Sequence, residues 1–590
     1  MKRLIFKVFV LFALLSACSS QQDDASDNAE QELKTVIANE KAYQDSLNPF
    51  IKENNIIFYD VSPQALEADH IAVSDIYSQL MAIDKASLSF DSQINHTILA
   101  YKLKNNIDSY DNFDHYMPIT AEAGFHAYLS YISSQSSFKT VADYQLYLQR
   151  LAELNTYFGQ QIFWMKKGLS TGITQPQVVL KGFESSISAF IVEDPTTSEF
   201  YRPFNQYPKY FSDDEKQQLT ELAKASIVEN VNTAYQKFYD FMVNEYIPNA
   251  RKTIAAKDFP NGEAFYQNRV EHYTTLKLTA DEIHNIGLEE VARIRSEMDA
   301  VIKSVNFKGS FAEFVQFLRT DPQFYATTPE QLLKEAAYIA KKADAKLPSL
   351  FKTLPRTPYG VIAVPASIAP KYTTGRYSGP SNDAQPGNYW VNTYALERRP
   401  LYVLEALTLH EAVPGHHLQG SIAREMKNVP EFRNQTYISA FGEGWGLYSE
   451  YLGIEAGFYQ DPYSQFGRLT YEMWRAVRLV VDTGMHVKGW SRQRAMDYLA
   501  NNSALSLHNV QTEIDRYISW PGQALSYKLG EITIKKLRAK AELELGEDFD
   551  IREFHDQILK NGSIPLSLLE QIINDYIAKQ KAEINKQNNS

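Results

Sequence analysis

The sequence contains a single cysteine, Cys18, so no disulfide bond can form within the chain. It has no basic stretch to offset its formal net charge of −12, which argues against nucleic acid as a partner. It also has no fixed-period repeat and no long Gly/Pro linker. What remains is a chain of 590 residues with ordinary globular composition, long enough to bury a large core.

The first residues have the pattern of an export signal. A basic segment, MKRLIFK, precedes an apolar run at 8–15 that is too short to span a bilayer stably. The quartet LSAC then resembles a bacterial lipobox, so we expect a signal peptide over 1–17 and lipidation of Cys18, the membrane attachment of the protein. The alternative is a plain secretory signal with an incidental cysteine. By resemblance to bacterial sorting rules, Ser19 predicts the outer membrane, facing the periplasm.

The rest of the chain is dominated by helical periodicity. Residues 18–33 are polar and acidic, which predicts a flexible tether, and 578–590 form a polar tail. Between them we expect a helical part over 34–255 and a second part over 256–577.

Two segments define the second part. Apolar residues at helical spacing predict a long helix over 280–305. The Gly-, Pro- and Tyr-rich segment 358–395 holds short β-like runs, Gly360–Val364 and Tyr389–Tyr394, which predict a small sheet. The fold class is therefore mainly α with a small β-sheet.

The segment LTLHEAVPGHHLQ, residues 407–419, opens like a zinc-protease motif but has Pro414 where the second histidine is expected. Proline removes an N–H and clashes with the carbonyl of His410, so the helix cannot run straight through the motif. On an undistorted helix neither His416 nor His417 reaches a metal shared with His410. Either one becomes the second ligand through a distorted Pro-Gly segment, or the histidines only cap a helix end.

A third ligand is predicted in FGEGWGLYSEYLG, residues 441–453. Glu443 and Glu450 are seven residues apart and lie on one helical face. The alternative is a solvated helix edge.

A polar stripe follows on an otherwise apolar helix. Arg475, Arg478, Asp482 and His486 share one face, which predicts buried and paired side chains. They form either a structural ion-pair network or a set that orients ligands and binds a substrate carboxylate.

Two tyrosines flank a second Pro-Gly pair in RYISWPGQALSYKLG, residues 516–530. Tyr517 and Tyr527 carry phenols that can donate to a developing oxyanion, although each is also an ordinary packing residue.

Together these segments resemble the bacterial DUF885 family, which is placed among the zincin-type metallopeptidases. The resemblance rests on ALTLHEAVPGHHLQ, FGEGWGLYSEYLG, RAVRLVVDTGMHVKGWS and WPGQALSYKLG. The earlier segments HYTTLKLTADEIHNIGLEEVARIRSEM and PGNYWVNTY fit as well, so the resemblance runs from about 262 to 530. More distantly, the order of motifs is similar to that of the angiotensin-converting-enzyme and thermostable-carboxypeptidase families. That likeness implies a large two-lobed, multi-helical metallopeptidase-like fold. Those families carry HExGH or HExxH, so this chain departs from them by two or three inserted residues.

The resemblance implies one zinc ion bound by His410, His416 and Glu443, because aligning the "GH" pairs selects His416. It implies Glu411 as general base and Tyr527 or His486 as the oxyanion donor, with a peptide as substrate. The expected substrate contacts are His417, Arg475, Arg478, Tyr517 and Asn392. Two other classes stay open, a lipoprotein that binds metal or peptide without turnover and a hydrolase of non-peptide amides or esters.

Overall fold

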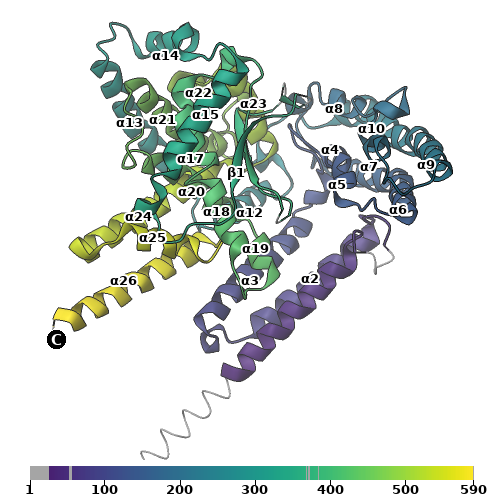
Figure 1. Cartoon of the computed structure of the whole chain (residues 1–590), viewed down its shortest axis with the longest axis horizontal. Helices are drawn as coiled ribbons and strands as arrows, with labels where there is room; N and C mark the ends of the chain where they lie inside the picture. The colour runs from purple at the N-terminus through teal and green to yellow at the C-terminus, as the bar shows by residue number, and fades with distance from the viewer. Residues whose placement is uncertain (1–25, 52–55, 367, 370–371, 383, 589–590) are drawn as a thin grey trace, which may run out of the picture. The chain divides into compact units, whose positions relative to one another are not determined.

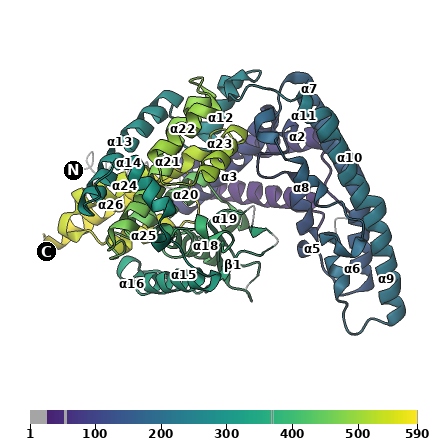
Figure 2. The same cartoon turned by 90° about the horizontal axis from the view of Figure 1, so that it is seen from above.

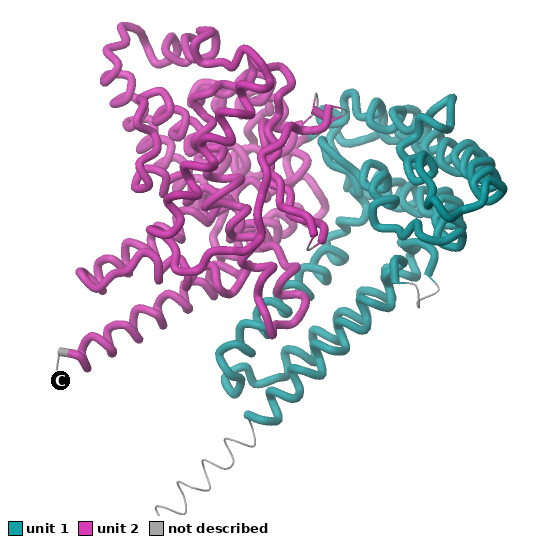
Figure 3. Tube along the Cα trace, in the orientation of Figure 1, with its two compact units in different colours: residues 1–253 teal, residues 254–590 magenta. Residues whose placement is uncertain are grey.

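The computed structural model describes residues 26–51, 56–366, 368–369, 372–382 and 384–588. The chain divides into two compact units, Met1–Thr253 and Ile254–Ser590 (Figure 3). The division falls close to the boundary expected between 255 and 256. The expected lipidation site, Cys18, lies outside the described residues.

The first unit is built from helices (Figure 1). A helix over 26–47 comes first, and the others are α2 (Pro63–Ala82), α3 (Phe90–Asp111), α4 (Phe125–Tyr128), α5 (Ile132–Gln135), α6 (Val141–Ala152), α7 (Leu154–Thr171), α8 (Glu184–Ser188), α9 (Asp213–Ser226), α10 (Thr233–Phe241) and α11 (Ile247–Asn249).

The expected tether over 18–33 therefore needs correction in its described part, because residues 26–33 are helical. Ala29, Leu33 and Val36 recur at helical spacing and are buried. The Glu30 carboxylate accepts two hydrogen bonds at the start of α3. The backbone N–H of Ser89 and the hydroxyl of Ser92 each donate to it at 2.7 Å.

The second unit is also mainly helical. Its helices are α12 (Gly262–Thr274), α13 (Ala280–Ser304), α14 (Phe311–Thr320), α15 (Pro329–Asp344), α16 (Leu347–Leu350), α17 (Leu404–Glu411), α18 (His416–Glu425), α19 (Glu431–Gln435), α20 (Ser439–Leu452), α21 (Pro462–His486), α22 (Arg492–Asn502), α23 (Leu507–Ser519), α24 (Ser526–Leu545), α25 (Ile551–Leu559) and α26 (Leu566–Asn588). The predicted long helix over 280–305 is α13. The expected polar tail is helical to Asn588, because α26 continues past its packed half. Within the described ranges, no helix combines the length and the apolar character needed to cross a membrane.

Two helix pairs form the centre of the second unit. Helix α13 packs along α21, and α20 packs along α24 (Figure 2). A buried ion network joins these helices. Lys528 of α24 is 0% exposed, and its Nζ lies 2.8 Å from Glu472 of α21 and 2.9 Å from Glu290 of α13. An arrangement of the helices that separated these partners would leave a buried charge unpaired, which is strongly destabilising. The network therefore favours the arrangement in which these helix faces meet.

A three-stranded sheet of order β1-β3-β2 precedes α17. Strands β1 (Tyr359–Ala363) and β3 (Gly387–Val391) are parallel, and β2 (Gly375–Ser378) is antiparallel to β3. The predicted runs correspond to β1 and β3. Strand β2, with the sequence GRYS, was not predicted, since it is too short to show an alternating apolar pattern. It is an edge strand, and it packs beside α17.

Candidate metal centre

The HEAVPGHH segment forms two helices joined by a tight break. Helix α17 ends at Glu411, and α18 begins at His416. Ala412 (φ −93°, ψ −113°) leaves the helical region, and the Val413–Pro414 peptide bond is cis. The indole N–H of Trp445 on α20 donates to the carbonyl of Pro414 at 2.8 Å and so holds the break. Pro414 has no N–H to donate to the carbonyl of His410, so the series of helical backbone hydrogen bonds stops here.

Two glycines allow close approaches at this break. A Cβ at Gly415 would lie 1.9 Å from the carbonyl oxygen of His410, so the chain can fold back on that residue only without a side chain. A Cβ at Gly446 would lie 2.7 Å from the ring of His410, so α20 passes directly against the imidazole. These two contacts fix the position of His410.

The break brings His410, His416 and Glu443 together. Glu443 Oε2 lies 3.5 Å from His410 Nε2 and 3.4 Å from His416 Nε2. The two imidazole rings are nearly perpendicular, with centroids 4.7 Å apart. One nitrogen or oxygen atom of each residue lies within 4.8 Å of the other two. The three side chains from three helices therefore converge on one point.

The electrostatics of this cluster favour an ionised carboxylate. Burial opposes the charge of Glu443, but its interactions with His416 and His410 hold its pKa well below the usual value. Burial likewise disfavours protonated His410, yet hydrogen bonds to Glu443 and Glu450 raise the pKa of His410 to about 10. The site therefore offers a negative oxygen between two imidazoles.

The second nitrogen of His410 is held by a buried carboxylate. His410 Nδ1 lies 2.8 Å from Oε1 of Glu450, which is 1% exposed. The same oxygen lies 3.3 Å from Nη2 of Arg475, whose Nη1 donates to the carbonyl of Tyr471 at 3.2 Å. Both acidic residues of the 441–453 segment thus face His410, one at each ring nitrogen. Arg475 acts on the site through Glu450, and its expected substrate contact stays a prediction.

Glu443 is oriented by a tyrosine that the sequence analysis did not select. The hydroxyl of Tyr437, just before α20, donates to Glu443 Oε1 at 3.0 Å and leaves Oε2 directed at the histidines. A Cβ at Gly442 would lie 2.3 Å from the Tyr437 ring, so the ring also needs that glycine. The sequence signal was a tyrosine six residues before the predicted ligand, which is weak without the fold.

Glu411 is held by the edge of the sheet. Its Oε2 accepts a 2.7 Å hydrogen bond from the backbone N–H of Tyr377 in β2. Because Asn392 N donates to Thr374 O and Tyr377 pairs with Tyr389, the alternation of an antiparallel ladder turns the Tyr377 N–H away from β3. The unpredicted strand β2 therefore positions the predicted general base.

His417 lies against the sheet and not at the metal cluster. It is 2% exposed, its Nδ1 lies 3.1 Å from the Tyr377 hydroxyl, and its ring centroid lies 4.5 Å from that of Tyr359 in β1. Burial lowers the pKa of His417 to about 4. A neutral, enclosed imidazole packs α18 on the sheet, so the expected substrate contact through His417 is not supported.

Asn392 and Tyr517 are also buried, and their expected substrate contacts stay predictions. Asn392 is 0% exposed, and its amide donates to three backbone carbonyls, including that of Ala369 at 2.9 Å. Tyr517 is 1% exposed, donates to Glu513 at 2.6 Å and accepts from Arg478 Nε at 2.8 Å. Both side chains are engaged in internal hydrogen bonds, because each closes a buried loop or helix contact.

His486, an expected oxyanion donor, is also buried and occupied. It is 0% exposed; its Nδ1 accepts from the backbone N–H of Ala256 at 3.1 Å, and its Nε2 donates to the carbonyl of Tyr517 at 2.9 Å. Its neighbour Asp482 accepts from the hydroxyl of Tyr266 at 2.6 Å. Asp482 and His486, the C-terminal half of the predicted polar stripe, therefore have structural roles.

Tyr527 keeps an uncommitted hydroxyl. It is 8% exposed and makes no hydrogen bond through its hydroxyl within the described chain. Its ring covers the guanidinium of Arg478 at 4.2 Å. Burial, Glu443 and the Tyr527 phenol together raise the pKa of Tyr437, whose hydroxyl donates to Glu443. Of the three expected donors, Tyr527 is the one whose hydroxyl makes no hydrogen bond within the described residues.

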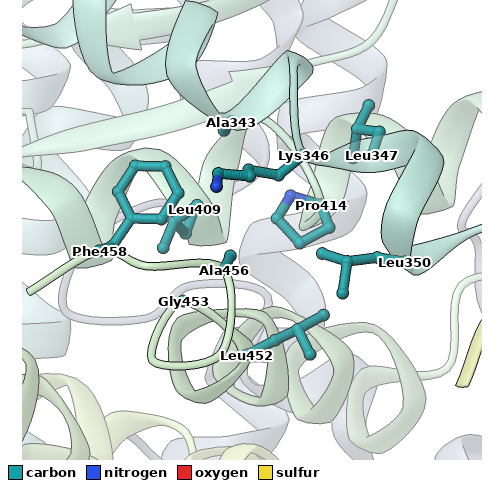
Figure 4. Close-up of a pocket in the computed structure, with 10 residues that line it drawn as sticks. All are labelled: Ala343, Lys346, Leu347, Leu350, Leu409, Pro414, Leu452, Gly453, Ala456 and Phe458. Carbon is teal, nitrogen blue, oxygen red and sulfur yellow. The ribbon is translucent and has the colours of Figure 1, made fainter.

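Apolar side chains back the ligand helix on its other side. A small cavity there is lined by Leu409 and Pro414 from the motif together with Leu452, Phe458 and Leu350 (Figure 4). Leu409 is the residue directly before His410, so these apolar contacts help to hold α17 in position. They add to the polar contacts of His410 with Glu450 and Glu443.

Comparisons with other proteins place this architecture. The model of a family described as bacterial proteins of unknown function, DUF885, matches residues 53–573. The crystal structure of a candidate lipoprotein from Colwellia psychrerythraea is 27% identical, covers 95% of this chain and 99% of its own, and superposes with a TM-score of 0.83. A candidate lipoprotein of unknown function from Shewanella oneidensis shares the fold at 16% identity, covering 94% and 99%, with a TM-score of 0.66. No curated protein matches.

Proposed function

The chain belongs to the DUF885 family, and from that premise we propose that it is a zinc-dependent peptidase, anchored by lipid in the bacterial cell envelope. The observation that carries the proposal is the convergence of His410, His416 and Glu443 from three helices. The resemblance of the motif order to zincin-type metallopeptidases supports the same activity.

The donor set fits zinc. Two donors that bind a tetrahedral zinc ion at about 2.0–2.1 Å lie roughly 3.4 Å apart. The Glu443 Oε2 atom lies 3.5 Å and 3.4 Å from the two Nε2 atoms of His410 and His416. Two imidazoles and one carboxylate are also the protein ligands typical of catalytic zinc, which leaves a fourth position for water or substrate. Glu450 behind His410 is the carboxylate partner that metal-bound histidines usually have.

The protein side chains around the cluster fit amide hydrolysis. When bound, zinc supplies a Lewis acid that polarises a carbonyl and lowers the pKa of its water. Glu411, next to ligand His410, accepts the proton of the attacking water and passes it to the leaving amine. The β2 N–H of Tyr377 keeps that carboxylate in place. The Tyr527 hydroxyl donates to the developing oxyanion.

The envelope location rests on the LSAC quartet at Cys18 and on the candidate lipoproteins that share the fold. Replacement of Cys18 by serine should release the protein from membranes, because the lipid is the attachment we propose. Fractionation after a salt wash measures this. A variant that still sediments with membranes argues against lipidation.

Metal analysis and a peptide-library digest together test the activity. We expect one zinc per chain, hydrolysis of peptides, loss of hydrolysis with a chelator and recovery with added zinc. Stoichiometric zinc without chelator-sensitive cleavage would favour a binding protein without turnover. Cleavage restricted to a panel of non-peptide amides or esters would instead change the substrate class.

A further inference from the structure

The first unit contains a cleft of its own, lined by residues from α5, α6 and the 3-10 helix Glu199–Asn205 with the chain that follows it. Its volume is about 520 Å³, within the range of roughly 300–1,000 Å³ typical of small-molecule sites. Six side chains determine its chemistry, namely Ser133, Phe138, Tyr144, Arg202, Gln206 and Tyr207. All of them belong to the unit Met1–Thr253, whereas the metal cluster belongs to the other unit.

Aromatic side chains supply the apolar part of the lining as one connected cluster. The ring centroid of Tyr144 lies 5.0 Å from that of Phe138 and 5.4 Å from that of Tyr207. Tyr144 is 1% exposed, and the other two rings are half-buried. The hydroxyl of Tyr207 hydrogen-bonds with that of Thr220 at 2.9 Å, and the hydroxyl of Tyr144 donates to the carbonyl of Pro203 at 3.3 Å. The polar ends of these rings are therefore occupied, and the rings offer the cleft apolar surface.

Three polar side chains of the lining are free to bind a ligand. The hydroxyl of Ser133, the guanidinium of Arg202 and the amide of Gln206 make no hydrogen bond within the described residues. The neighbouring Ser134 differs, because its hydroxyl donates to the carbonyl of Tyr131 at 2.7 Å. The cleft thus combines an aromatic cluster with a hydroxyl, an amide and a cation that have no internal partner.

The charge of the cleft favours an anion. None of its lining residues is acidic, and Arg202 has no ion-pair partner among the residues that the structure describes. The Asp143 carboxylate, at the start of α6, accepts from the Ser137 hydroxyl at 3.1 Å and from the backbone N–H groups of Lys139 and Thr140 at 2.9 Å and 3.0 Å. This carboxylate caps its own helix, so it does not neutralise the guanidinium.

We propose that this cleft binds an acidic saccharide, with the sugar ring against the aromatic cluster and the carboxylate on Arg202. A sugar ring has faces made of C–H groups, which pack on aromatic rings, and an edge of hydroxyls, which need donors and acceptors. The Gln206 amide and the Ser133 hydroxyl each supply both. A guanidinium matches the geometry and the charge of a carboxylate. This inference goes beyond the proposed peptidase function and does not depend on it.

A proline-rich peptide is the alternative occupant, because aromatic-lined grooves also bind such segments. Proline has no N–H and no charge. Such a peptide would leave the carbonyl of Gln206 without a donor and Arg202 without a counter-ion, and covering unpaired polar groups costs their desolvation energy. The free polar groups of the lining therefore favour the saccharide.

Binding to the whole protein, titrated by saturation-transfer NMR, tests the proposal with four probes. They are N-acetylmuramic acid, its methyl ester, lactate and a decaproline peptide. The ester keeps the sugar and loses the charge, whereas lactate keeps the carboxylate and loses the sugar. Charge-assisted hydrogen bonds are worth about 10- to 100-fold in affinity. We expect the acid to bind at least tenfold more tightly than each of the other three probes.

Other orders of affinity overturn the proposal. Equal binding of the acid and its ester would exclude recognition of the carboxylate, and equal binding of the acid and lactate would show that any anion suffices. Tightest binding of decaproline would make the cleft a peptide groove. Absence of binding by all four probes would also refute the saccharide site.

Variants locate the preference within the cleft. Arg202→Gln should bring the affinity for the acid down to that for the ester, and Arg202→Lys should keep part of the difference. Gln206→Ala should weaken the acid and the ester alike. Both positions are exposed, so these substitutions leave the core intact. Lys181→Gln is the matched control, because it removes the same charge from an exposed position of the same unit outside the lining.

The variants also separate this cleft from the metal cluster, which is a second place where a carboxylate can bind. A preference for the acid that survives in Arg202→Gln, or unaltered binding of both sugars in Gln206→Ala, contradicts the assignment. Circular dichroism confirms that each variant is folded. Because the readout is binding, a protein without hydrolase activity would refute the proposed peptidase and leave this inference standing.

Discussion

The Nδ1 atom of His410 lies 2.8 Å from Oε1 of Glu450, which is buried on the adjacent helix. This contact leaves Nε2 of the same ring directed at Glu443 Oε2, 3.5 Å away. One histidine thus joins the proposed metal position to a carboxylate–arginine pair, Glu450 and Arg475. Such partners set the tautomer and the orientation of a metal-binding imidazole.

Replacement of Glu450 by glutamine should weaken zinc binding by about 10- to 100-fold while the ligands remain. The charge that stabilises the Nδ1 proton of His410 is lost, although the size of the side chain is kept. Competition with a chromophoric chelator measures the affinity. Glu455→Gln is the matched control, because Glu455 lies just past the same helix and pairs with Arg538. Unchanged affinity in Glu450→Gln would refute the role.

Replacement of His416 by alanine should abolish stoichiometric zinc, whereas His417→Ala should retain it. The first imidazole faces Glu443 Oε2, and the second packs on Tyr377 and Tyr359. His417→Ala should instead lower the thermal midpoint, because a buried ring is removed. Metal content per folded chain by mass spectrometry decides between them, and the reverse result would exchange the two assignments.

The Glu411→Gln variant should keep zinc and lose hydrolysis. The glutamine oxygen can still accept the hydrogen bond from Tyr377, but a neutral amide cannot take a proton from water. Turnover and metal content are measured on the same preparation. Glu405→Gln, on the same helix, should keep both, since Glu405 accepts from the backbone of Tyr459 instead. Unchanged turnover in Glu411→Gln would exclude this general base.

Tyr527→Phe should lower turnover by about 10²-fold with little change in substrate binding, because only the oxyanion donor is removed. Tyr517→Phe should instead lower stability and leave turnover per folded molecule nearly intact, since its hydroxyl links Glu513 and Arg478. Steady-state kinetics and thermal melts separate the two. More than half of wild-type turnover in Tyr527→Phe would exclude Tyr527 as the oxyanion donor.

Asp482 should make stability depend on pH. Burial outweighs its hydrogen bonds and raises its pKa to about 7, against about 3.9 in an unfolded chain. The folded state therefore holds a proton that the unfolded state releases, so this contribution is complete below about pH 4 and is lost as the pH rises to about 7. Asp482→Asn should gain stability over wild type between pH 5 and pH 8, by at most about 4 kcal/mol.

Denaturant unfolding at pH 5 and at pH 8 measures the gain in the free energy of unfolding. Asp497→Asn, at an exposed position of α22, is the control and should show the same pH dependence as wild type. A constant difference between Asp482→Asn and wild type at both pH values would show that Asp482 does not titrate in this range.

Local sequence determined much of the architecture. Helical periodicity predicted the mainly α-helical class and α13, because a helix that buries one face must repeat apolar residues at its own period. Proline chemistry predicted that the helix breaks at Pro414, since the missing N–H is a property of the residue itself. The seven-residue spacing likewise placed Glu443 and Glu450 on one face of α20.

Only the tertiary structure decided how these elements are used. The choice between His416 and His417 depends on how Gly415 folds back on His410 and on Trp445 from another helix, and neither contact is a local preference. Strand β2 has no sequence pattern of its own, yet its free edge holds Glu411. The difference in hydrogen bonding between Tyr527, on the one hand, and Tyr517 and His486, on the other, also arises from the tertiary structure. All three belong to residue types that donate hydrogen bonds, and burial among different partners leaves only Tyr527, of these three, with an uncommitted donor.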